Sequence, residues 1–152
     1  MEEALQDIVE RNRSSLDRLR AIGSALYDAE LDRTIDSPWT AAALFAHIAF
    51  WDRFVLERWR LAAEKGHRTP VPEDNAVMDR INDASLRQWL AIPARIAVEE
   101  FIAAAGELEE LISRLDATIV SELVVEGRER LVDRSLHRGD HIRTLEEAFP
   151  SA

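Results

Sequence analysis

Residues 37–66, SPWTAAALFAHIAFWDRFVLERWRLAAEKG, carry the clearest helix signals in the chain. Ser37 is a favourable N-cap residue and Pro38 suits the first helical position, so we expect a helix to begin here. Gly66 is the expected stop, which ends the helix near Lys65. One face of this helix is mostly apolar and contains Leu44, His47, Ile48, Trp51, Phe54, Val55 and Arg58. Such a face predicts a long helix that packs against other helices.

Helical periodicity also covers most of the remaining chain. Apolar residues recur at spacings of three and four in three further long segments, residues 2–28, 93–115 and 128–149. A shorter helix is predicted over residues 75–90. The pattern therefore predicts an all-α fold, a four-helix bundle with an additional short connecting helix, in a single domain that spans residues 1–152.

Two segments lack this pattern. Residues 28–36 are mostly polar and are interpreted as a connection between helices. Residues 116–127 contain a run of β-branched side chains, which predicts a packed loop or a brief strand. The five prolines and five glycines fall between or near the ends of the periodic segments, which supports the helical interpretation of the rest.

The composition is that of a globular chain, because 47% of the 152 residues are apolar and 32% are charged. No apolar run approaches the roughly 18 residues of a membrane span, and the opening MEEALQDIVE is unlike a signal peptide, so we expect a cytoplasmic protein. The net charge of −10 argues against binding to nucleic acid or to an anionic membrane surface. The absence of cysteine excludes disulfides, thiolate metal sites and a cysteine nucleophile.

The histidines are the residues that suggest chemistry. His137 and His141 are four residues apart, which places both imidazoles on one side of a helix, where their nitrogens can converge on one ion. His47 lies within the apolar face of residues 37–66 and therefore faces the interior of the bundle. A third imidazole from a different helix would complete a metal site.

Two alternatives accompany this hypothesis. A spacing of four also arises by chance, and interior histidines often only bond to a neighbour, so the three residues are alternatively ordinary core side chains. A separate pattern, Glu64-Lys-Gly-His67, matches one half of a di-iron helical bundle. No second Glu-x-x-His follows, and His67 stands after a helix-ending glycine, so a di-iron centre is rejected.

These residues resemble a known family. Trp39 followed by residues 44–51, LFAHIAFW, is similar to the second-helix signature of the DinB-like superfamily, and His137-x-x-x-His141 is similar to its fourth-helix pair. Residues 73–89 resemble the extra short helix of that family. The resemblance implies a four-helix bundle, often a homodimer, that binds a divalent metal ion, zinc or nickel, with His47, His137 and His141 as ligands.

Three further residues are candidates for binding the substrate or supporting the ligands. Trp51 lies one helical turn after His47 and is expected to form a wall of the site, or simply part of the core. Arg134 and Arg138 lie near the histidine pair and are expected either to bind a carboxylate or phosphate of a substrate or to form salt bridges within the protein. No general base is assigned, because Asp52 and Asp140 adjoin the histidines in sequence and therefore point elsewhere on their helices.

Three functions follow from these residues. Three imidazoles leave a coordination position open, which is typical of a catalytic site and favours a metal-dependent transferase or hydrolase acting on a small molecule. The resemblance adds the expectation of a low-molecular-weight thiol cosubstrate, which would have to supply any sulfur nucleophile, since the chain has no cysteine. The alternatives are a non-catalytic ligand-binding or stress-related protein, and a purely structural helical module.

Overall fold

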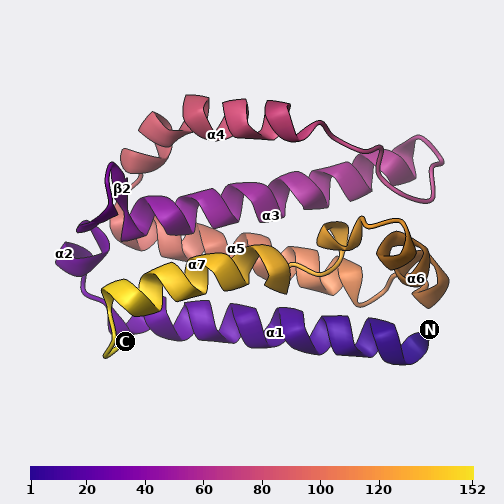
Figure 1. Ribbon diagram of the computed structural model, residues 1–152, viewed down its shortest axis with the longest axis horizontal. Helices are drawn as coiled ribbons and strands as arrows, with labels where there is room; N and C mark the ends of the chain where they lie inside the picture. The colour runs from indigo at the N-terminus through magenta and orange to yellow at the C-terminus, as the bar shows by residue number, and fades with distance from the viewer.

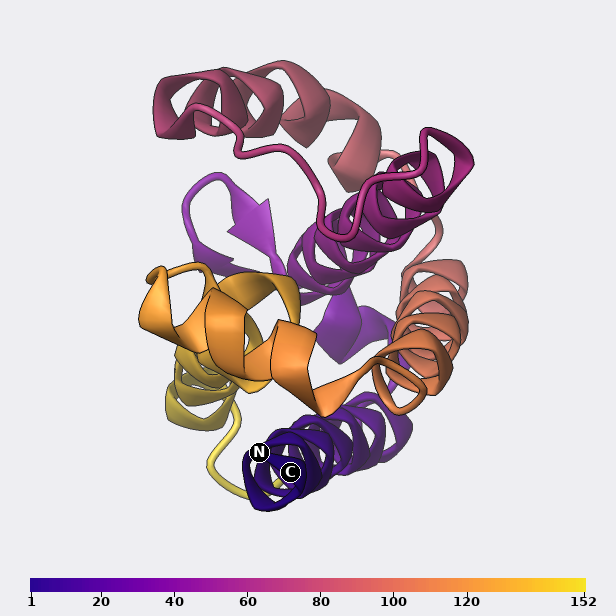
Figure 2. The ribbon, with the colours of Figure 1, turned by 90° about the vertical axis from the view of Figure 1, so that its right-hand side faces the viewer.

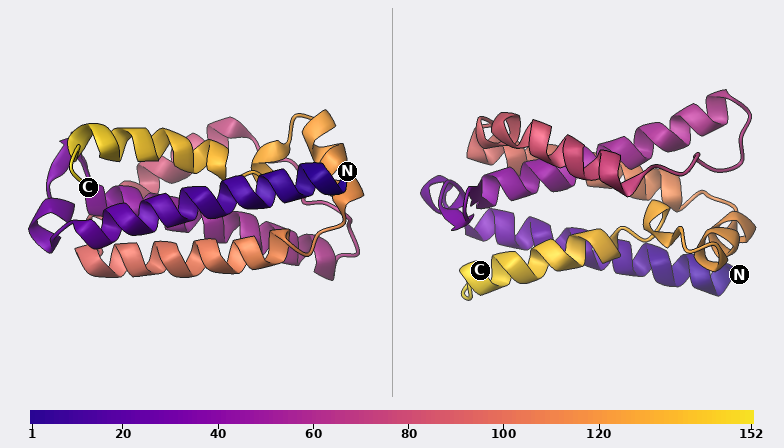
Figure 3. Two further views of the ribbon diagram at one scale, coloured as in Figure 1. Left: turned by 90° about the horizontal axis from the view of Figure 1, so that it is seen from below. Right: turned by 45° about the horizontal axis from the view of Figure 1, so that its top comes forward.

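A computed structural model describes residues 1–152 and has four long helices arranged as a bundle (Figures 1 and 2). α1 (Glu2–Ala25) and α7 (Ser135–Ala148) run in one direction, whereas α3 (Ala41–Glu64) and α5 (Ala94–Ile112) run in the opposite direction. The fold is therefore all-α, as the hydrophobic periodicity predicts. The chain termini lie at opposite ends of the bundle (Figure 3).

The remaining elements connect these helices. α4 (Asn75–Leu90) runs along the outside of α3 and is the predicted connecting helix, although its 16 residues exceed the 14 of α7 (Figure 3). The link between α1 and α3 holds one short helix, α2 (Asp28–Leu31), and a hairpin of β1 (Thr34–Asp36) and β2 (Trp39–Thr40). Between α5 and α7 lie α6 (Ala117–Val125) and the 3-10 helix Glu129–Leu131. No helix combines the length and apolar character that crossing a bilayer requires.

Two groups of buried apolar side chains form the core. The larger group lies among α1, α3 and α5 and includes Phe45 and Phe101, whose ring centroids are 5.8 Å apart. The smaller group surrounds Trp59 near the other end of α3. Gly23 allows α1 to approach α5, since a Cβ atom at this position would stand only 2.7 Å from the Val98 Cγ1 atom.

The start of α3 differs from the sequence prediction. Ser37 and Pro38 form the turn of the β1–β2 hairpin, and the helix begins at Ala41. Its cap is Thr40, whose hydroxyl oxygen accepts a hydrogen bond of 3.0 Å from the backbone N–H of Ala43. The prediction fails because Ser37 and Thr40 are both favourable N-cap residues, and the local sequence does not show which of them caps the helix. The predicted end is confirmed, since Gly66 follows the helix with a φ of +73°.

The prediction of a loop or strand within residues 116–127 is wrong, because α6 occupies this segment. Asp116 caps the helix by accepting a 2.7 Å hydrogen bond from the backbone N–H of Thr118. Val120 and Leu123 then lie on one face and are buried in the smaller core group. Burial of that face outweighs the weak preference of β-branched residues for strands.

The last helix is shorter than predicted, because residues 128–134 are not part of it. Asn12 of α1 bonds to the backbone at this break: its amide N–H group donates to the Val132 carbonyl at 2.7 Å, and its oxygen accepts from the N–H groups of Arg134 and Ser135 at 2.8 and 3.1 Å. These contacts satisfy backbone groups at the start of α7 in the way that a local cap would. Asn12 therefore has a structural role.

Candidate metal centre

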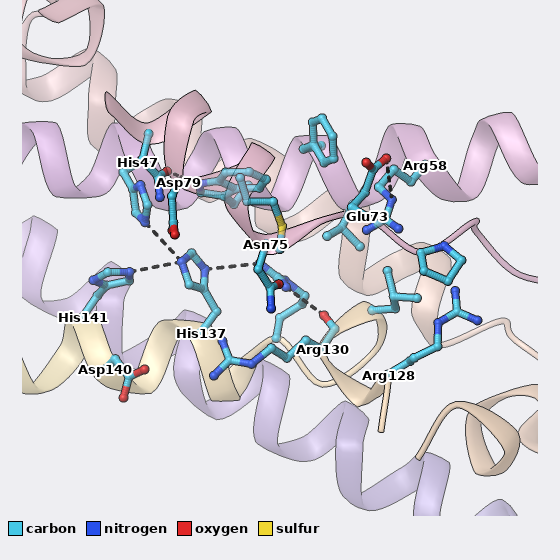
Figure 4. Close-up of a pocket in the computed structure, with 18 of the residues that line it drawn as sticks. His47, Arg58, Glu73, Asn75, Asp79, Arg128, Arg130, His137, Asp140 and His141 are labelled. Carbon is cyan, nitrogen blue, oxygen red and sulfur yellow. Dashed lines mark hydrogen bonds and ion pairs between the residues drawn. The ribbon is translucent and has the colours of Figure 1, made fainter. Parts of the chain in front are cut away.

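Helices α3 and α7 bring three imidazoles together, and we call His47, His137 and His141 the histidine cluster (Figure 4). One nitrogen from each ring lies within 4.8 Å of the other two. The Nε2 atom of His137 is 3.2 Å from that of His47 and 3.1 Å from that of His141. Residues 90 positions apart in sequence thus meet, as the interior face of α3 and the i, i+4 pair of α7 predict.

The spacing of these nitrogens fits a shared metal ion. Two nitrogens bound to one ion at about 2.1 Å are separated by about 3.0 Å in octahedral and about 3.4 Å in tetrahedral geometry. The two distances from His137 lie in this interval, and the nitrogens of His47 and His141 lie within 4.8 Å of each other. The group contains only imidazoles, which suit zinc and nickel alike.

The hydrogen-bonding pattern also fits a cation. The guanidinium Nη2 of Arg134 lies 3.2 Å from the Nδ1 atom of His137, and because arginine only donates, this Nδ1 atom accepts. A neutral His137 then carries its proton on Nε2, where one hydrogen serves two contacts, to His47 and to His141. In addition, the Nδ1 atom of His47 is buried without a hydrogen-bond partner. The cluster is thus incompletely satisfied by protein groups alone.

All three imidazoles are kept neutral. Burial lowers the pKa of His47 to about 3 and that of His141 to about 4. Burial also lowers the pKa of His137 well below its usual value, and the positive charge of Arg134 adds to this effect. Neutral imidazole is the form that ligates metals, so this protonation state is compatible with a metal site at neutral pH.

Two tryptophans fix the orientation of His47. The rings of Trp39 and Trp89 meet the imidazole edge to face, with centroid distances of 5.4 and 5.1 Å. Trp39 comes from β2 and Trp89 from the end of α4, so two connecting elements support one candidate ligand. The sequence places Trp89 on a separate short helix, and no signal within the sequence pairs it with His47.

A second polar group lies deeper in the bundle, and we call Asp52, Glu109, Arg134 and Arg138 the Asp52 network. Asp52 accepts a 2.8 Å hydrogen bond from Arg134 and one of 2.9 Å from Arg138. Arg138 also donates to Glu109 at 2.7 Å, and the side chains of Asp52 and Arg138 are 0% exposed. Arg138 is therefore not available to bind a substrate.

Arg134 links the Asp52 network to the histidine cluster. Its Nε atom bonds Asp52, its Nη1 atom donates to the Arg130 carbonyl at 2.8 Å, and its Nη2 atom contacts His137. The contact at Nδ1 fixes the orientation of the His137 ring, whose Nε2 atom points to the other two histidines. The position of Asp52, directed away from His47 toward the arginines, agrees with the expectation that it does not act on the ligands.

A cavity of about 570 Å³ opens beside the histidine cluster. Its walls come from α3, α4, α7 and the segment around the 3-10 helix, and all three histidines line it. Trp51 lines it as well and donates a 2.7 Å hydrogen bond to Asn82 of α4. His67, by contrast, is exposed and lies outside this cavity. A volume of this size accommodates a small molecule next to the imidazoles.

Comparison with known proteins adds one match. The sequence profile of the DinB superfamily matches residues 11–145, which include the whole histidine cluster and the Asp52 network. No curated protein and no solved structure matches the chain significantly.

Proposed function

The chain belongs to the DinB superfamily, and from this premise and the geometry of the site we propose that it binds one divalent metal ion through His47, His137 and His141 for a reaction on a small molecule. The observation that carries the proposal is the convergence of three Nε2 atoms from two helices at the wall of a cavity. Zinc and nickel are the ions we propose, because imidazole nitrogen suits both.

The protein supplies position and electrostatics. The two tryptophans hold His47, Arg134 orients His137, and burial keeps the three imidazoles neutral. Three histidine ligands would leave at least one coordination position open to a molecule in the cavity. When bound, the ion supplies a Lewis acid that lowers the pKa of a coordinated water or thiol, or polarises a carbonyl group.

We propose transfer or hydrolysis as the reaction class. The chain has no cysteine, so a sulfur nucleophile would come from a low-molecular-weight thiol that enters the cavity as a cosubstrate. The carboxylate of Asp140 lines the cavity but forms an ion pair with Arg143. The chain itself offers no thiol, so the nucleophile would come from outside it, as a thiol or a water molecule.

A screen of activity tests this proposal. Protein purified without chelator is loaded with zinc or nickel and assayed with thiol cosubstrates and with ester and amide probes. We expect turnover in the wild type and in the His67→Gln control, and its loss in His141→Gln. Tight binding of probes without turnover in any metal form would favour the non-catalytic alternative.

A further inference from the structure

The cavity extends well beyond the histidine cluster. His47, Trp51 and Arg58 lie along one face of α3, and all three line it. Arg58 follows His47 by 58 − 47 = 11 residues, which corresponds to about 16 Å along a helix axis. The cavity is thus elongated, with the imidazoles at one end and Arg58 near the other (Figure 4).

Charge is separated along this cavity. Asp79 and Asp140 lie beside the imidazoles, whereas Arg58 and Arg128 lie at the opposite end (Figure 4). The side chain of Arg130 extends toward His137, and its positive charge contributes to the lowered pKa of that imidazole. We call Arg58 and Arg128 the arginine group.

The charges of the arginine group are poorly compensated by the protein. The closest carboxylate oxygen to Arg58 belongs to Glu73, at 3.8 Å, which is longer than a hydrogen bond. Arg128 pairs at 3.2 Å with Glu126, whose side chain is 55% exposed.

The donors of the arginine group are also incompletely used. Arg58 and Arg128 each donate to one backbone carbonyl of the loop between α3 and α4, those of Val71 and Pro70. Each guanidinium has five N–H donors, so several remain free to face the cavity. Burial lowers the pKa of Arg58, and the nearby positive charges of Arg128 and Arg134 lower it further, against the effect of Glu73. An anion would relieve this repulsion.

We infer that the arginine group binds the anionic group, a carboxylate or a phosphate, of an elongated small molecule whose other end reaches the histidine cluster. Planar guanidinium groups recognise both anions through paired hydrogen bonds. The second half of this inference rests on the proposed function, whereas the anion site itself does not. The acidic side chains near the imidazoles set the orientation, because they repel the anionic end and leave the arginine group as its partner.

The test is to titrate inorganic phosphate and succinate separately into the metal-free protein by calorimetry. We expect saturable binding of at least one of them, and the two titrations distinguish phosphate from carboxylate recognition. Arg58→Gln removes one guanidinium of the arginine group and is expected to weaken binding on the order of 10-fold to 100-fold. Arg128→Gln is expected to have an effect of similar size.

The matched control is Arg20→Gln, which makes the same change in net charge on the exposed surface of α1, where Arg20 pairs only with Asp17. It is expected to change the dissociation constant less than twofold. The anion site is refuted if neither anion binds saturably to the wild type, if Arg58→Gln and Arg128→Gln bind as the wild type does, or if Arg20→Gln weakens binding equally.

A histidine variant separates the two proposals. His47→Gln is expected to lose metal affinity and to keep the wild-type affinity for the anion. Loss of anion binding in this variant would place the anion at the histidine cluster and overturn the assignment to the arginine group. If the wild type binds no metal while the arginine variants still weaken anion binding, only the proposed metal-dependent function fails.

Discussion

Two i, i+4 pairs face α3, Arg134 and Arg138 at the start of α7 and His137 and His141 within it, and comparing them separates stability from function. The arginine pair meets Asp52 and forms the Asp52 network, whereas the histidine pair meets His47 and forms the histidine cluster. The network is buried, and two carboxylates compensate its two guanidinium groups. The histidine cluster is neutral and lines a cavity, and the single hydrogen on the Nε2 atom of His137 serves contacts to both His47 and His141.

The same i, i+4 spacing thus serves two purposes, and the side-chain chemistry of the pair decides which. A closed set of opposite charges has no capacity left for a ligand, and removing one member leaves a buried charge without a partner. An open set of lone pairs costs stability in the free protein and gains a partner when a cation binds. Substitutions in the Asp52 network should therefore change mainly stability, and substitutions in the histidine cluster should change mainly ligand binding.

The largest effect is expected from Asp52→Asn. This substitution removes the negative charge between two buried guanidinium groups, and it should lower the free energy of unfolding by about 3–5 kcal/mol. Urea denaturation followed by circular dichroism measures the change. Asp17→Asn is the control, since Asp17 is exposed and should change stability by less than about 0.5 kcal/mol. A loss below about 1 kcal/mol for Asp52→Asn would remove the structural role of the network.

The next effect concerns metal affinity. His141→Gln removes one of three ligands and should weaken zinc binding on the order of 100-fold or more, while the unfolding free energy of the metal-free protein changes little. Competition titration with a chromophoric chelator measures the dissociation constant. His67→Gln, which alters an exposed histidine outside the cavity, should bind zinc like the wild type. Equal affinity of both variants would contradict the cluster as the metal site.

The pH dependence of stability should also distinguish the two groups. The folded protein keeps His47 and His141 neutral down to pKa values of about 3 and 4, whereas the unfolded chain protonates them near pH 6.5. The unfolded state therefore gains protons first, and the metal-free protein loses stability as the pH falls below about 6.5 toward 4.

Between pH 7 and pH 5 each of these histidines should cost on the order of 1–2 kcal/mol. In His141→Gln the loss over the same interval should be smaller by that amount, measured by urea denaturation at both pH values. Identical losses in the variant and the wild type would mean that His141 is not kept neutral by the fold.

The smallest effect is expected where α4 covers the cavity. Trp51→Phe keeps the ring and removes the 2.7 Å hydrogen bond to Asn82, which should cost about 0.5–1.5 kcal/mol. Amide hydrogen exchange should become faster in α4 and stay unchanged in α7, with zinc affinity unaltered. Faster exchange across α7 would show that the cover and the candidate site are not independent.

The sequence predicts the histidine cluster better than the Asp52 network, for a physical reason. A histidine inside an apolar stripe and an i, i+4 pair are both visible in local periodicity, and helix packing brings them together. Asp52 follows Trp51 on the same helix, and its partners lie more than 80 residues away, so nothing local pairs it with Arg134 or Arg138. From the sequence alone, Arg134 and Arg138 consequently suggest a substrate site. In the structure their guanidinium groups are instead paired with the carboxylates of Asp52 and Glu109.

The boundaries of the helices follow the same rule. The range of α4 is predictable because its periodicity and its cap, Asp74, are local. The break before α7 is not, because Asn12 of α1 bonds to the backbone at residues 132–135 across more than 100 positions. A tertiary contact determines the start of this helix, and with it the place from which His137, Arg138 and His141 face α3.

X-ray absorption spectroscopy on zinc-loaded protein tests directly whether His47, His137 and His141 bind one shared ion. We predict three imidazole nitrogens at about 2.0–2.1 Å and at least one oxygen ligand, with one imidazole lost in His47→Gln and none lost in His67→Gln. A spectrum with fewer than two imidazoles, or one that His47→Gln leaves unchanged, would contradict a shared ion at the histidine cluster.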